Sequence, residues 1–332
     1  MNAKRKLNRL ALCVALSCLL GSGMAAASPA SGDLYYTLFG GAPNVWKIAF
    51  SYDGTTASLG APTAIVSAPG ADGIIFAPSG NLLIGGQGTS KVYEYKTDGT
   101  PVSMGAVGSP SFHLSLDPSG TKVWTSDFGG ALSDLPLGPV GDHVGALHAI
   151  TGSESGITQL AFTPGGKTYY VNGSPNGFGN LGVIDMGTFV TTSFATSVKT
   201  AHGIVYDSFT GLMTLFGAGE VGSFDPFSAT PAATLKGVGT GVCDFDQGAV
   251  DGKGHALVAG CGGITFIDYS TSLDITTPDY IKFFGGFGAI DDVAPLSGLG
   301  AGPPVPEPAS LLLAAAGLLG LGLARRRQRA AG

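Results

Sequence analysis

The chain has 332 residues, of which 44% are hydrophobic, 12% are charged and 55 are glycine. Four of its 17 basic residues lie before residue 28 and four lie after residue 305, so the segment between keeps nine lysines, no arginine and 22 acidic residues, a net charge of −13. Such an acidic surface argues against nucleic acid as a partner and against adhesion to anionic lipid.

The N-terminal residues have the pattern of a secretory signal peptide. Basic residues among the first nine precede an apolar stretch at residues 10–20, and three alanines at 25–27 offer a cleavage site before Ser28. We therefore expect residues 1–27 to be removed on export through the Sec pathway. Two of the four cysteines lie in the apolar stretch and leave with it.

The middle of the chain is a repeat of short predicted strands. Segments rich in β-branched and aromatic residues alternate with glycine turns, and none has a convincing helical period, which predicts an all-β domain. One unit, from Asp72 to Gly99, reads as strand, turn, strand, loop, strand and turn. Turn glycines stand at 80, 120, 166, 211 and 254, so the unit recurs every 40 to 46 residues. That period, with three or four strands per unit, is typical of β-propeller blades.

The two ends of the predicted domain, residues 28–300, complete one further blade. Segments 33–38 and 44–50 read as second and third strands that lack a first, and segment 289–294 reads as a first strand without followers. Together with five internal units they make six blades and leave no open sheet edge. Seven blades is the alternative, because segment 129–155 is poorly patterned. We expect that segment to supply the third and fourth strands of the blade that contains Trp124.

The repeat unit, DGIIFAPSGNLLIGG followed by KVYEYKTDG, resembles the blades of NHL, gluconolactonase-type and virginiamycin B lyase-like propellers. The resemblance covers most of the predicted domain, but such patterns recur in many propellers. It implies the fold and does not imply a function.

Two cysteines remain after the signal peptide is removed. Cys243 and Cys261 are equidistant from residue 252, in a predicted hairpin turn, so they face each other if no bulge shifts the register. A facing antiparallel pair lies within disulfide range, and the exported compartment is oxidising. We expect a disulfide, with two free buried thiols as the alternative. No second Cys or His pair completes a zinc set.

A candidate site follows from aligning the six first strands, which line the central channel of a propeller. The alignment places one residue of each blade at a common level: Asp72, Phe112, Thr158, His202, Asp246 and Asp291. His113, Gln159, Asp244 and Asp292 stand next to them. Asp72, His202, Asp246 and Asp291 are the candidate ion site, which could hold Ca²⁺ or a similar hard cation through oxygen ligands.

Two other interpretations of these channel residues stay open. They could act as acid and base in a lactonase-like or lyase-like reaction, or they are the polar lining that any propeller has at its channel mouth. His143, His148 and His255 occupy loop or strand-start positions without a supporting cluster. No Ser-His-Asp grouping, phosphate loop or zinc motif occurs, so we assign no catalytic residue.

The C-terminal segment has three parts. Pro306, Glu307 and Pro308 end a linker at residues 301–308, an apolar run without charge follows at 309–324, and a basic tail at 325–332 begins with Arg325, Arg326 and Arg327. At about 1.5 Å per residue the apolar run spans roughly 24 Å as a helix, a little less than a bilayer core of about 30 Å. Snorkelling arginines offset part of the difference, and the basic tail is expected to stay cytoplasmic.

This tail resembles a PEP-CTERM sorting signal. The resemblance implies that the chain is a substrate of an exosortase, a membrane-embedded cysteine transpeptidase-like enzyme of Gram-negative bacteria that also make exopolysaccharide. An ordinary membrane anchor is the alternative, although it does not need Pro-Glu-Pro before its helix. The protein is then expected to be anchored in the inner membrane facing the periplasm, and to reach the cell surface or the extracellular matrix.

Two hypotheses of function remain after these observations. The favoured one is a surface or matrix protein whose propeller is a binding or structural module, with exopolysaccharide or surface proteins as partners. The alternative is a secreted hydrolase or lyase that uses a metal in the central channel. The sequence does not decide whether the protein is an enzyme, and the non-catalytic hypothesis is favoured because no ligand set of a known propeller enzyme family can be matched residue by residue.

Overall fold

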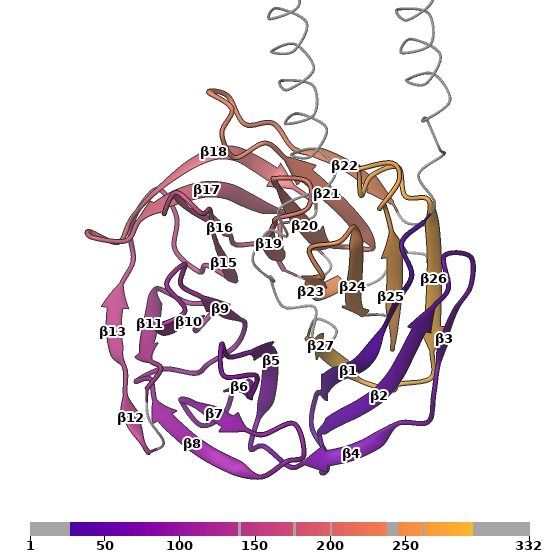
Figure 1. Ribbon diagram of the computed structural model, residues 1–332. Coiled ribbons are helices and arrows are strands. Elements are labelled where there is room, and N and C mark those ends of the chain that lie inside the picture. Colours follow the sequence, from indigo (N-terminus) through magenta and orange to yellow (C-terminus); the bar gives the residue numbers. More distant parts are fainter. Residues whose placement is uncertain are drawn as a thin grey trace, which may run out of the picture. The chain divides into compact units, whose positions relative to one another are not determined.

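The computed structural model describes residues 27–138, 141–174, 177–199, 201–237, 245–260 and 262–294. Within these residues every regular element is a β-strand, and the strands form six sheets. The sheets belong to one compact unit of the chain and stand around a common axis (Figure 1). The prediction of an all-β, six-bladed propeller is therefore confirmed, and the seven-bladed alternative is wrong.

Each sheet is one blade, and its innermost strand lines the central channel (Figure 1). Blade 1 joins the two ends of the domain and contains β27 (Ile290–Val293), β1 (Ala30–Leu38), β2 (Val45–Tyr52), β3 (Ala57–Leu59) and β4 (Thr63–Val66). Blade 2 contains β5 (Ala71–Phe76), β6 (Leu82–Gly86), β7 (Lys91–Tyr95), β8 (Pro101–Ala106) and β12 (His143–Val144). Blade 3 contains β9 (Leu114–Leu116), β10 (Lys122–Ser126), β11 (Ala131–Pro136) and β13 (Ala146–Ala149).

The remaining three blades follow in chain order. Blade 4 contains β15 (Gln159–Phe162), β16 (Thr168–Val171), β17 (Gly179–Asp185), β18 (Val190–Val198) and β14 (Thr151–Gly152). Blade 5 contains β19 (Gly203–Asp207), β20 (Leu212–Gly217), β21 (Glu220–Phe224) and β22 (Thr234–Gly237). Blade 6 contains β23 (Phe245–Val250), β24 (His255–Gly260), β25 (Gly263–Asp268) and β26 (Tyr280–Gly285).

The composite blade closes the ring as the sequence predicted. The last strand, β27, pairs antiparallel with β1, with Tyr36 opposite Val293, and the backbone N–H of Ala294 donates to the carbonyl of Tyr35 at 2.8 Å. Every innermost strand contacts the innermost strand of the next blade, and the sixth such contact, between β23 and β27, completes the circle. The two ends of the domain therefore hold each other in one sheet.

The poorly patterned segment 129–155 does supply the third and fourth strands of the Trp124 blade, β11 and β13. It also does something that its pattern did not indicate. Its short strand β12 pairs parallel with β8 of blade 2, and β14 pairs parallel with β18 of blade 4. The segment thus covers the outer edges of both neighbouring blades, which removes two exposed edges from the propeller.

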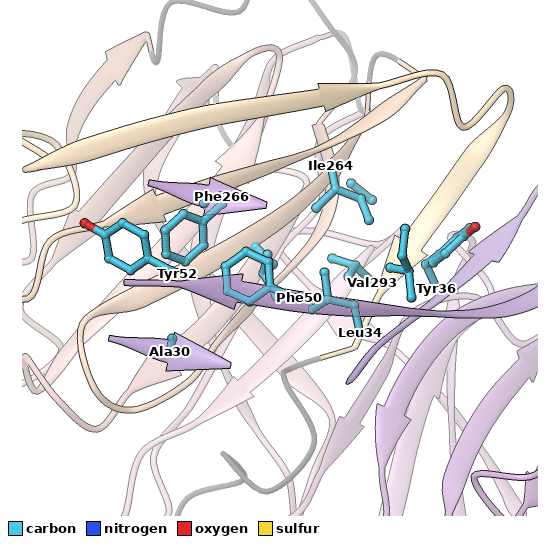
Figure 2. Packing of buried hydrophobic residues seen from close by; sticks show 12 residues of the cluster. Ala30, Leu34, Tyr36, Phe50, Tyr52, Ile264, Phe266 and Val293 are labelled. Atoms are coloured by element: carbon cyan, nitrogen blue, oxygen red, sulfur yellow. The ribbon is translucent and has the colours of Figure 1, made fainter. Parts of the chain in front are cut away.

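The hydrophobic core lies between the blades in separate clusters rather than in one centre. Between blades 6 and 1, the rings of Phe50 and Phe266 lie 4.8 Å apart, and Leu34, Ile264 and Val293 pack beside them (Figure 2). The alternating apolar residues of β1 and β2 supply one wall of this cluster. Each such fully buried side chain contributes roughly 1.5–3 kcal/mol, so the ring is held together by blade-to-blade contact.

A buried polar cluster, the rim cluster, also ties blade 6 to blade 1. His255 bonds Asp251 through Nδ1 at 2.5 Å and the carbonyl of Ser28 through Nε2 at 2.8 Å, and the hydroxyl of Tyr52 donates to Asp268 at 2.6 Å. The expectation that His255 has no supporting cluster is therefore wrong. Its partners come from a turn, from the N-terminal segment and from two neighbouring strands, and no local sequence pattern joins them.

Several sequence predictions fall on residues outside the described ranges. These are the signal peptide up to residue 26, Asp244, Cys243, Cys261 and everything after residue 294. Among the described residues no helix is long and apolar enough to cross a membrane. The pairing of β23 with β24 carries a register shift between Phe245 and Gly248. The disulfide argument assumed an unshifted pair, so the disulfide stays a prediction.

Candidate functional site

The first turn of the inner strands brings acidic and imidazole side chains together in the channel. Asp72, Asp246 and Asp291 are each the second residue of an inner strand, while His113 and His202 each come directly before one. These strands, β5, β9, β19, β23 and β27, all border the centre of the ring (Figure 1). Five of the six blades therefore contribute a titratable group to one place, which we call the channel cluster.

Glycines next to the cluster let the inner strands approach closely enough. A Cβ on Gly73 would lie 2.6 Å from the carbonyl oxygen of Phe112 and 2.9 Å from the Cα of His113. A Cβ on Gly203 would lie 2.9 Å from the carbonyl oxygen of Asp246. Only glycine fits at such distances, so the residues that follow Asp72 and His202 set how near those side chains come to the neighbouring blade.

Two imidazoles converge on one carboxylate oxygen. His113 Nε2 and His202 Nε2 each lie 2.7 Å from Oδ1 of Asp246, although the three residues come from blades 3, 5 and 6. Nδ1 of His202 lies 2.5 Å from the carbonyl of Gly173. A carbonyl only accepts, so Nδ1 donates to it, and Nε2 is the nitrogen that bonds Asp246. Metal-binding histidines commonly donate their other ring N–H to a carbonyl in this way, so His202 would be oriented for a cation that took the place of the proton between Nε2 and Asp246.

A second grouping shares His113. Asp72, His113 and Asp292 offer ligand atoms that lie within 4.8 Å of one another, as do those of His113, His202 and Asp246. Asp292 is completely buried, Asp72 is 4% exposed and His113 is 3% exposed. Four buried atoms here have no hydrogen-bond partner: Nδ1 of His113, Oδ2 of Asp292, Oδ2 of Asp291 and Oε1 of Gln247. Buried polar atoms rarely lack a hydrogen-bond partner.

Burial and mutual repulsion shift the pKa values in the channel cluster. Burial, and then the charges of Asp291 and Asp246, raise the pKa of Asp72 well above its usual range. Burial and Asp246 raise the pKa of Asp292 in the same way, and that of Asp291 to about 7. Burial would also raise the pKa of Asp246, but hydrogen bonds from His113 and His202 outweigh it and lower that pKa. The cluster thus holds more carboxylates than its two imidazoles can neutralise.

The donor set fits a divalent cation. A cation would give the unpaired carboxylate oxygens a partner and offset the mutual repulsion that raises the pKa values of these carboxyl groups. Each grouping includes a histidine nitrogen, which suits metals such as Zn²⁺, Mn²⁺ or Co²⁺ better than Ca²⁺, an ion that takes oxygen ligands. The cavity that His113 lines beside Trp124 and Gln159 has no room for a water molecule.

The predicted residues divide into two groups. The structure brings Asp72, His202, Asp246 and Asp291 together, with His113 and Asp292 beside them. Phe112 and Thr158, aligned at the same level, do not join: the Thr158 hydroxyl donates to the carbonyl of His202 at 2.7 Å, and the Phe112 ring stacks on Phe128.

Gln159 is also outside the cluster, because its side-chain oxygen accepts from the backbone N–H of Ile204. Sequence reasoning missed three residues beside the cluster: Gly173, Gln247 and Phe128. The Gly173 carbonyl meets His202, and the backbone N–H of Gln247 donates to Asp292. Both contacts form only on folding and leave no signal in the sequence. Phe128 stands in an Asp-Phe-Gly-Gly turn, which predicts a hairpin but not what its ring touches.

A larger groove of about 640 Å³ lies elsewhere, between β26 of blade 6 and β1 and β2 of blade 1. Tyr36, Trp46, Phe283 and Phe287 line it, with Lys282 as its charged residue. None of the predicted site residues contributes to this groove.

Comparisons with known proteins support the C-terminal sorting motif and the propeller fold. Residues 304–328 match the family model of the PEP-CTERM protein-sorting motif. Among solved structures, a chain of a nidogen/laminin complex aligns with a TM-score of 0.59 at 10% identity, over 80% of this chain and 98% of that one. The periplasmic gluconolactonase of Pseudomonas aeruginosa aligns with a TM-score of 0.50 at 11% identity, over 77% of this chain and 83% of that one. None of the curated proteins matches significantly.

At such identities the structural likeness concerns the fold alone. The resemblance of the repeat to gluconolactonase-type propellers is confirmed at that level. The sorting motif carries more, because it implies export, anchoring in a membrane during sorting, and an exosortase as the processing partner. The chain is thus a six-bladed β-propeller that carries a C-terminal PEP-CTERM protein-sorting motif, as expected of an exosortase-sorted surface protein.

Proposed function

We propose that the propeller is a cation-binding structural and recognition module, displayed at the cell surface or in the extracellular matrix, with exopolysaccharide or other surface proteins as partners. The observation that carries the proposal is the convergence of His113, His202 and Asp246 from three blades. A cation at this point would cross-link the blades at the axis of the ring. The acidic globule, with its net charge of −13, suits a soluble display domain.

A metal analysis of the purified full-length chain tests the cation. We expect about one equivalent of a divalent metal, and a thermal unfolding temperature that falls when a chelator removes it. His202→Ala should weaken metal binding, so that the purified chain carries less metal and the chelator has a smaller effect. Lys236→Ala, in the outer strand β22, serves as a control that should change neither. A chain that binds no divalent metal at micromolar concentration would refute the proposal.

The sorting step needs its own experiment. Glu307→Ala should block processing and leave the protein in the inner membrane, whereas Glu154→Ala, in the propeller, should not. Deletion of the exosortase should give the same retention as Glu307→Ala. If processing and location stay unchanged in both cases, the C-terminal segment is only an anchor.

A secreted lactonase-like hydrolase is the second candidate. Asp246 and Asp291 are partly exposed, while the other members of the channel cluster are buried. A substrate in the channel would therefore meet a carboxylate whose neighbours are imidazoles, an arrangement that suits general acid–base chemistry. If a panel of lactones reveals an activity that is lost in Asp72→Ala, His202→Ala and Asp291→Ala, the protein is an enzyme and the non-catalytic proposal fails.

A further inference from the structure

The channel cluster is covered on its histidine side by an aromatic ring from a hairpin. Phe128 lies in the turn that joins β10 to β11 in blade 3. Its ring centroid is 5.0 Å from that of His113 and 5.6 Å from that of His202, and both imidazoles meet it edge to face, at 78° and 77°. Phe112 stacks on the same ring at 4.2 Å. Phe128 thus contacts both histidines that point at Asp246.

The backbone of Phe128 adopts a conformation that a phenylalanine rarely adopts. Its φ is +54°, in the left-handed region, where a bulky side chain is unfavourable. The turn is held in place by Asp127, whose Oδ1 accepts from the N–H groups of Gly129 and Ala131 at 2.8 and 3.2 Å. Strain of this kind persists only where the surroundings fix it, and it clusters at binding sites. Here the fixed element places one ring over two imidazoles.

Solvent reaches the outer side of this arrangement. Phe112 and Phe128 are half-buried, whereas His113 and His202 are 3% and 1% exposed. The Phe128 ring therefore reaches solvent while it contacts the two buried imidazoles. An ion that enters or leaves the two Nε2 atoms on this side has to pass the Phe128 ring.

We infer that Phe128 is the cap of the channel site and sets the rate at which a cation exchanges with His113 and His202. This inference rests on the proposed cation site and adds a regulator to it. The cap covers the histidine side of the site, where its ring contacts both imidazoles. Phe128 acts as a positioning residue and is not itself a ligand.

A second hairpin provides the matched control. Phe189 also has a left-handed backbone, with φ of +57°, and its ring stacks on His148 at 4.2 Å. That pair lies where blades 3 and 4 meet, beside Trp124, and it is not part of the channel cluster. Removal of the Phe189 ring thus repeats the loss of a strained phenylalanine next to a histidine without touching the channel.

The test measures Co²⁺ exchange by stopped flow, with the visible absorption of the histidine-bound ion as the signal and a chelator to start its release. In Phe128→Ala we expect both association and release to become at least about ten-fold faster than in the wild-type chain, because the gate to the site is removed. Phe128→Gly should behave in the same way and guards against misfolding, since glycine accepts the left-handed backbone. Phe189→Ala should leave both rates unchanged.

The outcomes separate this inference from the proposed function. If the wild-type chain binds no Co²⁺, both are overturned. If Co²⁺ binds but neither Phe128 variant changes the association rate, the cation site stands and the cap is overturned. Faster release without faster association also overturns the cap, because that result describes a weakened site rather than an opened one.

Discussion

The propeller contains two buried histidine–aspartate clusters, and they differ in how completely their polar atoms are paired. In the rim cluster, both nitrogens of His255 face oxygen acceptors, one on Asp251 and one on Ser28. In the channel cluster, Nδ1 of His113 and Oδ2 of Asp292 face none. A fully paired buried cluster needs no ligand to satisfy its polar atoms, whereas unpaired buried atoms call for an explanation such as a bound ion. The comparison therefore supports the proposal that the rim cluster is structural and that the channel cluster binds a cation.

The largest expected effect concerns the rim. His255→Ala should lower the free energy of unfolding by about 3–5 kcal/mol, because it leaves Oδ2 of the buried Asp251 without its imidazole partner. Urea unfolding measures the change. His148→Ala, which removes a histidine that is 24% exposed and bonded to Asp134, should cost less than about 1 kcal/mol. Equal losses in the two variants would mean that the rim cluster is no more structural than a surface pair.

The second effect concerns the channel. His202→Ala should weaken the binding of Co²⁺ about 100-fold, which corresponds to roughly 2.7 kcal/mol, and isothermal titration measures it. His255→Ala, examined under conditions where it is folded, should bind Co²⁺ as the wild-type chain does. If His255→Ala loses the metal and His202→Ala keeps it, the channel cluster is not the metal site.

A third effect tests how the channel is assembled. Gly73→Ala forces a Cβ to within 2.6 Å of the Phe112 carbonyl, so β5 and β9 must separate. Overpacking of this kind costs about 1–3 kcal/mol, and we expect a weaker Co²⁺ affinity with it, since Asp72 and His113 move apart. Gly88→Ala in the same blade points into open space and should change neither quantity. If Gly73→Ala binds Co²⁺ with unaltered affinity, the spacing of β5 and β9 does not determine how the site binds metal.

The sequence predicted the architecture and the neighbourhood of the site, and it failed where contacts depend on packing. Turn glycines recur because each hairpin needs a positive φ, from 67° at Gly120 to 95° at Gly254, so the blades could be counted. The level of Asp72, His202, Asp246 and Asp291 follows from the same period. The alignment favoured Phe112 over His113, because one residue of shift decides which side chain faces the axis. Nothing local indicated that Phe128 would reach both histidines.

The smallest effect is a pH dependence of the rim. Burial lowers the pKa of His255, but its hydrogen bond to Asp251 and the charges of Asp251 and Asp268 outweigh burial, and the pKa is raised above its usual value of 6.5. Tyr52 and Phe266 complete its surroundings. A histidine whose pKa is raised by folding binds its proton more tightly in the folded chain. Its contribution to stability is full below pH 6.5 and is lost as the pH rises through the folded pKa.

This dependence is checked by urea unfolding of the wild-type chain and of His255→Gln from about pH 5 to about pH 9. The difference in unfolding free energy between the two should shrink as the pH rises. A difference for His255 that grows with pH would mean that the neutral imidazole is the form that the rim binds. In that case the rim and channel clusters would differ in how many of their polar atoms have hydrogen-bond partners, but the rim would not be distinguished by a protonated histidine.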